Sequence, residues 1–270
     1  MSQTKIAVFG CAGRMGQNLL RVADGDDACI IAGAGERPGH DWIAQDIGTL
    51  LGISAPGVAV TADPAELFKN ADVVIDFTMP EATIANAKIA ADTGVALIAG
   101  TTGLSHDQEA VIAEAATKTA IMRAANFSVG VNLLEQLTKR AASILGQDFD
   151  IEILEMHHKH KVDAPSGTAL MLGYAAAEGR QVNHDDVAAR GRDGITGARK
   201  AGDIGYAVLR GGNVAGEHTV MFATEDERIE LTHKATDRGI FAKGAIRAAL
   251  WTAGRGPGLY SMLDVLGFAD

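Results

Sequence analysis

The first half of the chain alternates short apolar runs, rich in β-branched residues, with longer alanine-rich segments that mix apolar and polar positions. The short runs predict buried strands, and the longer segments predict helices. Such alternation is typical of consecutive strand and helix units around a parallel sheet. The predicted strands cover residues 5–9, 28–34, 58–61, 72–77, 95–99 and 120–123, and the predicted helices cover residues 14–23, 64–70, 81–93 and 105–118.

Several helix ends carry local signals. Asp63 precedes Pro64, which predicts an N-cap followed by a proline in the first helical position. Pro80 is expected to open the helix that follows Thr78. Gly94 lies just past one helical pattern, so we expect it to end that helix at C′.

The pattern changes from about Ser128 onward. The later apolar runs predict a second, α+β domain, with helices on one face of a mixed or antiparallel sheet. Residues 190–205 are rich in glycine and charge and predict a mobile loop, because they offer little to bury. The predicted strands are 150–155, 206–209, 219–223 and 228–233, and the predicted helices are 131–145, one from about Ser166, and 241–253.

Composition narrows the class of protein. Of 270 residues, 47% are hydrophobic and 21% are charged, which is typical of a soluble globular protein. The net charge of −10 argues against broad binding to nucleic acid or to anionic membranes. Two cysteines, Cys11 and Cys29, cannot form a disulfide framework and favour a reducing cytoplasm. No apolar stretch approaches the roughly 20 residues that span a bilayer, so we expect a mature, soluble chain.

Three glycines, Gly10, Gly13 and Gly16, lie between the first predicted strand and helix. Their spacing is GxxGxxG rather than GxGxxG, but glycines there still allow a tight turn beside a helix N-terminus that can bind a pyrophosphate. Glu36, at the end of the second strand, is placed to bind the adenosine ribose, and Arg37 to bind a 2′-phosphate. This pattern predicts an α/β fold with a Rossmann-type doubly wound parallel sheet that accepts NADH and NADPH. A turn with a solvated Glu-Arg pair is the simpler alternative.

Polar and glycine residues also follow three further predicted strands, at residues 76–78, 100–103 and 124–127. In a doubly wound sheet, ligands bind outside the carboxyl ends of the strands. These segments are therefore expected to approach the nicotinamide ribose and carboxamide. Each of them, taken alone, also fits a capped turn.

Residues 157–161 concentrate three histidines and two lysines. A solvated basic loop would explain this composition. A metal site lacks an HExxH pair or a cysteine ligand, and a nucleic-acid site lacks interleaved aromatics. Histidine can supply a proton near neutral pH, and lysine can hold an anion. The following segment, Pro165 to Thr168, predicts a helix start that can bind a carboxylate. Together these features predict hydride transfer to a small carboxylate substrate.

The motifs, taken together, resemble the 4-hydroxy-tetrahydrodipicolinate reductase family, also called dihydrodipicolinate reductase. The resemblance extends over essentially the whole chain, and the His/Lys segment is its most specific part. The family implies a nucleotide domain formed by 1–128 plus 240–270, with a substrate-binding and oligomerisation domain, 129–239, inserted. The segments that carry the resemblance are 10–16, 76–78, 100–103, 124–132, 157–168, 216–219 and 232–235.

The resemblance also implies a reaction. It is the NAD(P)H-dependent reduction of 4-hydroxy-tetrahydrodipicolinate to tetrahydrodipicolinate, with loss of water, in the diaminopimelate route to lysine. His157 matches the family's proton donor or acceptor and Lys161 its proton donor. A homotetramer with no metal, and closure between the two domains, are further expectations. Another NAD(P)-dependent reductase of an amino or oxo acid, or a dinucleotide-sensing regulator, are the alternatives.

The remaining site residues divide by ligand. His158, Gly167 and Thr168 match residues that hold the substrate dicarboxylate. Met79 stands where family members often have a basic residue, so the choice between NADH and NADPH stays open. The cofactor residues implied by the resemblance are Gly10, Cys11, Ala12, Gly13, Arg14 and Met15 for the pyrophosphate, Glu36 and Arg37 for the adenosine half, and Gly100, Thr101, Thr102, Ala124, Ala125, Asn126 and Phe127 for the nicotinamide half.

Overall fold

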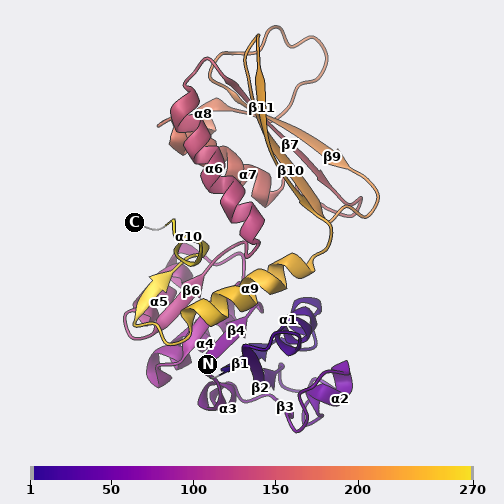
Figure 1. Ribbon diagram of the computed structural model, residues 1–270, viewed down its shortest axis with the longest axis vertical. Helices are drawn as coiled ribbons and strands as arrows, with labels where there is room; N and C mark the ends of the chain where they lie inside the picture. The colour runs from indigo at the N-terminus through magenta and orange to yellow at the C-terminus, as the bar shows by residue number, and fades with distance from the viewer. Residues whose placement is uncertain (1–2, 269–270) are drawn as a thin grey trace. The chain divides into compact units, whose positions relative to one another are not determined.

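The computed structural model describes residues 3–268, which fold into two compact units (Figure 1). The first unit is formed by Met1–Val129 together with Gly239–Asp270, and the second by Gly130–Arg238. The second unit is thus inserted into the first. The chain returns from it to complete the first unit.

The first unit is built on a seven-stranded parallel sheet with the order β12-β6-β5-β4-β1-β2-β3. The order reverses between β1 and β4. At such a switch point two neighbouring connections leave in opposite directions, which opens a crevice at the carboxyl ends of the strands. The strands are β1 (Thr4–Phe9), β2 (Cys29–Gly35), β3 (Val60–Thr61), β4 (Val73–Asp76), β5 (Ala96–Ala99), β6 (Ala120–Arg123) and β12 (Gly258–Tyr260).

Helices cover both faces of this sheet, so the predicted doubly wound arrangement is confirmed. Ile6 and Val8 of β1 belong to a core shared with α1 and α9, whereas Ala7 and Phe9 belong to a second core shared with α3, α4 and α5. The alternation follows from the two-residue period of a strand. The helices of this unit are α1 (Arg14–Asp24), α2 (Ile47–Leu51), α3 (Pro64–Asn70), α4 (Pro80–Thr93), α5 (His106–Ala116), α9 (Gly239–Thr252) and α10 (Met262–Leu266).

The predicted helix ends are confirmed. Asp63 accepts a hydrogen bond from the backbone N–H of Ala65 at 2.9 Å, with Pro64 in the first helical position. Pro80 opens α4, and Gly94 ends it with a left-handed φ of 73°. The sequence pattern missed α2, β12 and α10, because these elements are too short for a periodic signal to emerge.

The second unit contains a mixed five-stranded sheet with the order β11-β10-β7-β9-β8. The central strand β7 pairs antiparallel with β10 and parallel with β9. Of the two predicted alternatives, the mixed sheet is therefore the one that forms. The elements are α6 (Val129–Leu145), β7 (Asp150–His157), α7 (Gly167–Gly179), α8 (His184–Val187), β8 (Ala188–Ala189), β9 (Ile204–Arg210), β10 (Gly216–Ala223) and β11 (Arg228–Ala235).

Strand β7 extends to His157, two residues beyond the predicted end at residue 155. Its burial alternates strictly to the end, with Ile151, Ile153, Glu155 and His157 buried. This buried face packs against α6 and α7 (Figure 1). The polarity of the His/Lys segment suggested a loop, but Glu155 and His157 continue the inward positions of the strand.

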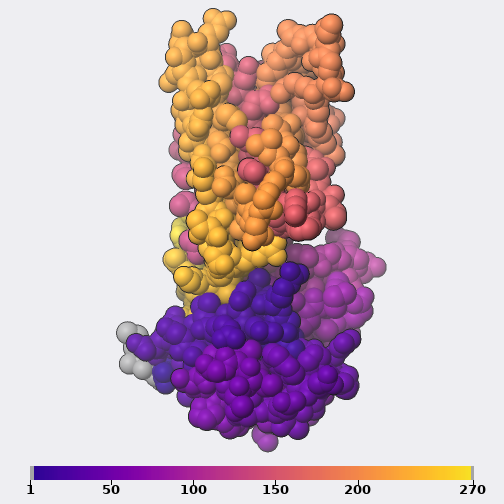
Figure 2. All heavy atoms as spheres, turned by 90° about the vertical axis from the view of Figure 1, so that its right-hand side faces the viewer, coloured from indigo at the N-terminus to yellow at the C-terminus, as the bar shows by residue number. Residues whose placement is uncertain are grey.

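The opposite face of this sheet carries no helix of the second unit and is turned toward the viewer in Figure 2. Residues 190–203, which join β8 to β9, have no regular secondary structure. The predicted loop, 190–205, thus extends two residues too far, because Ile204 and Gly205 belong to β9. Among residues 3–268, no helix combines the length and apolar character needed to cross a bilayer.

Candidate functional site

The glycine loop after β1 brings the start of α1 close to the end of the strand. Gly10 adopts a positive φ of 67°. A Cβ on Gly16 would lie 2.1 Å from the carbonyl oxygen of Gly10, so only glycine permits this approach. The first turn of a helix presents its backbone N–H groups at the N-terminus. The loop and helix therefore form a cradle that suits a pyrophosphate.

Two backbone N–H groups of the glycine loop already have partners within the protein. The N–H of Cys11 donates to the oxygen of Gly35 at 3.0 Å, and that of Gly13 donates to the oxygen of Gly10 at 3.0 Å. The Cys11 side chain is fully buried, and burial, with a smaller effect of Glu36, raises its pKa to about 12. Cys11 therefore shapes the loop as a neutral thiol, and the helix that starts at Arg14 has the N-terminus that could bind an anion.

Glu36 lies beside this loop, as its position after β2 predicted. Its carboxylate accepts hydrogen bonds from the backbone N–H of Ala12 at 3.2 Å and from that of Arg37 at 3.0 Å. Arg37 is exposed. The two residues are thus held at the carboxyl edge of the sheet, adjacent to the glycine loop.

Buried polar groups organise the ends of β4 and β5. Asp76 is fully buried and accepts hydrogen bonds from Thr78 N–H at 2.8 Å, Thr78 Oγ1 at 2.5 Å and Asn86 Nδ2 at 2.8 Å. Thr101 Oγ1 lies 2.6 Å from Thr83 Oγ1. These bonds connect both strand ends to α4. Asp76 lies in the 76–78 motif of the sequence, but the motif alone predicts no role for its carboxylate.

Aromatic rings join the ends of β4, β5 and β6. The rings of Phe77 and Phe127 lie 5.1 Å apart, and a Cβ on Gly100 would come within 2.4 Å of the Phe77 ring. Asn126 accepts a hydrogen bond from Ser128 N–H at 2.9 Å, which shapes the turn after β6. The three predicted strand-end segments are therefore neighbours at one edge of the sheet. Thr102 and Ala125 are exposed there, and Ala124 is half-buried.

In the second unit, His157 ends β7 beside two buried groups. Its Nδ1 lies 2.5 Å from Oε2 of Glu155. Glu155 also accepts two hydrogen bonds from the guanidinium of Arg210, at 2.9 and 3.0 Å. Burial alone would raise the pKa of Glu155. The hydrogen bonds from Arg210, His157 and the Ser166 N–H outweigh this effect and lower the pKa below its usual value, so the carboxyl is ionised at neutral pH. The pairing of Glu155 with Arg210 could not be predicted from the sequence, because the two residues are 55 positions apart along the chain.

His158 and Lys161, which follow His157 in the chain, each have a charged partner. Nη2 of Arg238 lies 2.9 Å from Nε2 of His158, whose pKa is lowered first by desolvation and then by Arg238. Lys161 forms an ion pair with Asp163 at 2.8 Å, and this pairing lowers the pKa of the Asp163 carboxyl. Arg238 was missed by the sequence analysis, because it lies 80 residues from His158 along the chain.

Helix α7 begins next to these residues. Ser166 caps it by accepting a hydrogen bond from the N–H of Ala169 at 3.1 Å. Gly167 and Thr168 are its first residues, and a Cβ on Gly167 would meet no atom within 4 Å. A helix N-terminus with open space before it suits a carboxylate. The structure therefore brings His157, His158, Lys161 and this helix start together in the second unit.

His218, on β10, also belongs to this cluster. Its Nε2 lies 3.1 Å from the Ser166 hydroxyl, and its ring contacts that of His157 edge-on with centroids 5.0 Å apart. Burial lowers its pKa to about 4, aided by the nearby His157, so the ring is neutral at pH 7.

Within the described range, residues 3–268, no group of three or more His, Cys, Asp or Glu is placed to hold a metal ion.

Comparison with known proteins identifies the family. The family described as dihydrodipicolinate reductase matches residues 4–127 with its N-terminal profile and residues 130–266 with its C-terminal profile. The 4-hydroxy-tetrahydrodipicolinate reductase of Ruegeria pomeroyi is 57% identical over 262 residues, which is 97% of each chain. That of Rhodopseudomonas palustris strain HaA2 is 55% identical over 270 residues, covering 100% of each chain.

A solved structure shares the fold. The dipicolinate-bound dihydrodipicolinate reductase from Paenisporosarcina sp. TG-14 superposes with a TM-score of 0.78 at 24% identity, covering 97% of this chain and 98% of that one. With both halves of the chain matched, and with full-length relatives above 50% identity, the chain belongs to the 4-hydroxy-tetrahydrodipicolinate reductase family.

Proposed function

We propose that this protein reduces 4-hydroxy-tetrahydrodipicolinate to tetrahydrodipicolinate, with loss of water, in the diaminopimelate route to lysine. The observation that carries this proposal is the cluster in the second unit. There a histidine hydrogen-bonded to a buried carboxylate lies beside a lysine and a helix N-terminus. A proton donor next to an anion cradle is what reduction of a cyclic dicarboxylate requires.

The first unit provides a cradle for NADH or NADPH. The close approach of Gly16 to Gly10 and the helix start at Arg14 support pyrophosphate binding. The hydrogen bond from Ala12 N–H to Glu36 supports a role for this carboxylate at the adenosine ribose. The nicotinamide half would lie along the ends of β5 and β6. When bound, the nicotinamide supplies the hydride.

The second unit handles the proton and the charges of the substrate. His157 and Lys161 deliver the proton that neutralises the charge developing on the reduced ring. Lys161, His158 and the backbone of Gly167 and Thr168 hold the two carboxylates. Because these groups are cations or N–H donors, they bind the dicarboxylate without requiring a basic protein surface.

The direct test is substitution of the two proton-transfer residues. His157→Gln should lower kcat by about 10²- to 10⁴-fold, the usual contribution of general acid catalysis, with little change in NADH affinity. Lys161→Ala should impair both substrate binding and turnover. His160→Gln and Lys159→Ala are matched controls, because both residues are exposed in the same segment. Steady-state kinetics with freshly generated substrate measures these effects, and wild-type kcat in His157→Gln would contradict the assignment.

The proposed dual cofactor use rests on Glu36 and Arg37, which are adjacent at the end of β2. Arg37→Ala should raise KM for NADPH more than KM for NADH, because only NADPH carries a 2′-phosphate. Kinetics with both cofactors at matched concentrations provides the comparison. Equal losses for NADH and NADPH would show that Arg37 does not bind the phosphate.

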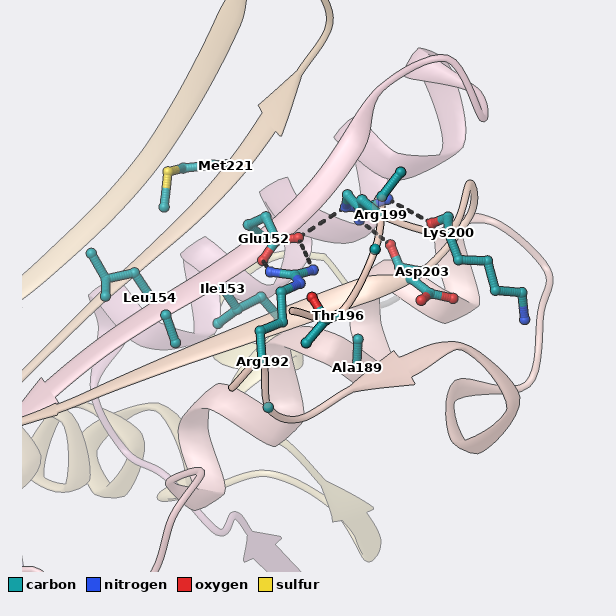
Figure 3. A pocket seen from close by; sticks show the side chains of 14 residues that line it. Glu152, Ile153, Leu154, Ala189, Arg192, Thr196, Arg199, Lys200, Asp203 and Met221 are labelled. Carbon is teal, nitrogen blue, oxygen red and sulfur yellow. Dashed lines mark hydrogen bonds and ion pairs between the residues drawn. The ribbon is translucent and has the colours of Figure 1, made fainter. Parts of the chain in front are cut away.

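We also propose that the protein acts in the cytoplasm as a homotetramer assembled through the second unit. The uncovered sheet face carries Leu154, Met156, Met221 and the exposed Leu209, which favours association. Glu152 on this face is bound by Arg192 at 2.7 and 2.9 Å and by Arg199 at 2.9 Å, beside a hollow of about 780 Å³ (Figure 3). Sedimentation equilibrium tests the proposed stoichiometry.

A further inference from the structure

Glu155 is a buried carboxylate on β7, two residues before His157. Only 1% of its surface is exposed. Removing a carboxylate from water is costly unless hydrogen bonds and an opposite charge compensate for it. The partners of Glu155 therefore indicate what its burial achieves.

Each oxygen of Glu155 has two partners. Oε2 lies 2.5 Å from His157 Nδ1 and accepts from Arg210 Nη1 at 2.9 Å. Oε1 accepts from the backbone N–H of Ser166 at 3.0 Å and from Arg210 Nη2 at 3.0 Å. Arg210 also donates to the carbonyl oxygen of Asp163 at 2.6 Å, which connects it to the segment that follows Lys161. The Glu155 side chain thus contacts both His157 and Ser166, the N-cap of α7.

The ionised carboxylate of Glu155 determines which ring nitrogen of His157 carries a proton. Glu155 is ionised at neutral pH, because the hydrogen bonds it accepts lower its pKa more than burial raises it. An ionised carboxylate only accepts hydrogen bonds, so His157 Nδ1 must carry the proton of their shared bond. His218, on the other side, has a pKa lowered to about 4 and adds no competing cation at pH 7.

The second ring nitrogen of His157 is kept accessible by glycine. A Cβ on Gly216 would come within 3.0 Å of Nε2, so a side chain there would crowd this atom. With Nδ1 engaged by Glu155, Nε2 is the nitrogen left to exchange a proton with a substrate.

We propose that Glu155, held by Arg210, is a positioning residue that orients His157 with Nε2 as its proton-transferring atom and sets its distance from the carboxylate-binding start of α7. This inference rests on the proposed role of His157 in proton transfer. Protein donors occupy both oxygens of Glu155, so it would act through His157 and Ser166 rather than on the substrate itself.

The tautomer of His157 can be measured in the unmodified protein. Nitrogen-15 NMR of the protein labelled in its histidines, recorded at pH 8, distinguishes protonated from unprotonated ring nitrogens, and His157→Gln assigns the signals. We expect His157 to carry its proton on Nδ1. A proton on Nε2 would overturn the inference without any variant of Glu155 being needed.

Glu155→Gln tests the consequence for catalysis. His157 and Ser166 donate to different oxygens of Glu155, and glutamine replaces one of these oxygens with an NH2 group, which donates and cannot accept, so one of the two bonds is lost. We expect the Nδ1–H preference to be lost, kcat to fall by roughly 10²-fold, and KM for the dicarboxylate to rise, with NADH affinity unchanged. Retention of wild-type kcat would overturn the inference.

Glu152→Gln is the matched control, because Glu152 also lies on β7 and is also bound by arginine, but on the opposite face. It should keep wild-type kcat and the His157 tautomer, and an equal loss of kcat in Glu152→Gln would overturn the inference by indicating a general structural effect. The kinetics of these variants distinguish the positioning role of Glu155 from the proton-transfer role of His157. If only the positioning role is wrong, His157→Gln is impaired while Glu155→Gln is active. If His157→Gln is fully active, both are wrong.

Discussion

Two buried carboxylates, Asp76 and Glu155, lie near the carboxyl ends of their strands in the two units. Each accepts at least three hydrogen bonds from neighbouring groups. Asp76 lies in a motif of the sequence and Glu155 directly precedes the His/Lys segment, but spacing alone does not distinguish a paired buried carboxylate from a solvated one. Their partners, Asn86 and Arg210, come from other elements of the fold.

His218 makes the stability of the protein pH-dependent. Its pKa falls from 6.5 to about 4 on folding, because the buried ring resists protonation. Below pH 6.5 the unfolded chain therefore binds a proton that the folded chain does not, and stability declines as the pH falls toward 4. The loss between pH 6.5 and 5 is roughly 2 kcal/mol.

Calorimetry at pH 7.5 and pH 5 measures this effect. His218→Gln should show a smaller decrease of Tm between the two pH values than the wild type, since glutamine does not titrate. His160→Gln, which removes an exposed histidine, should behave as the wild type does. The same decrease in all three proteins would exclude His218 as the source.

Among the elements, periodicity predicted the six strands from β1 to β6 and four of the five helices between them, all except α2, with boundaries that differ by up to two residues. It failed where the signal was short or misleading. β12 has three residues and pairs through Gly258, Leu259 and Tyr260 with β6. The predicted strand 150–155 stops two residues before the end of β7, because the polar residues that follow resemble a loop when their buried partners are unknown.

Helix α9 is positioned by a close contact that one glycine permits. A Cβ on Gly244 would lie 1.7 Å from the carbonyl oxygen of Phe127, in the segment that follows β6. Gly244→Ala should therefore displace the helix or that segment, lower the stability by roughly 1–3 kcal/mol and weaken NADH binding.

Gly256→Ala is the matched control, because a Cβ there meets no atom within 4 Å. Thermal unfolding and fluorescence titration with NADH measure the two effects. An unchanged Tm in Gly244→Ala would show that this contact relaxes without cost.

At the scale of the whole molecule, the chain leaves the first unit after Val129 and returns to it at Gly239. The order of elements along the chain does not reveal that β12 is the edge strand beside β6. Pairing of residues 258–260 with residues 120–122 requires α9 to bring the chain back across the sheet. Such long-range pairing depends on packing between distant segments rather than on local propensity.

The parallel-sheet architecture, the glycine loop, the caps of α3 and α4, and the His/Lys segment could be recognised in the sequence, because they depend on local periodicity, backbone freedom and neighbouring residue types. The partners of the histidines, in contrast, depend on how distant segments fold together. Glu155 with Arg210, Ser166 with His218, and Arg238 with His158 are separated by 52 to 80 residues along the chain. Their hydrogen bonds exist only because folding places the ends of β7 and β9 and the start of β10 beside the start of α7, and the segment after β11 beside His158.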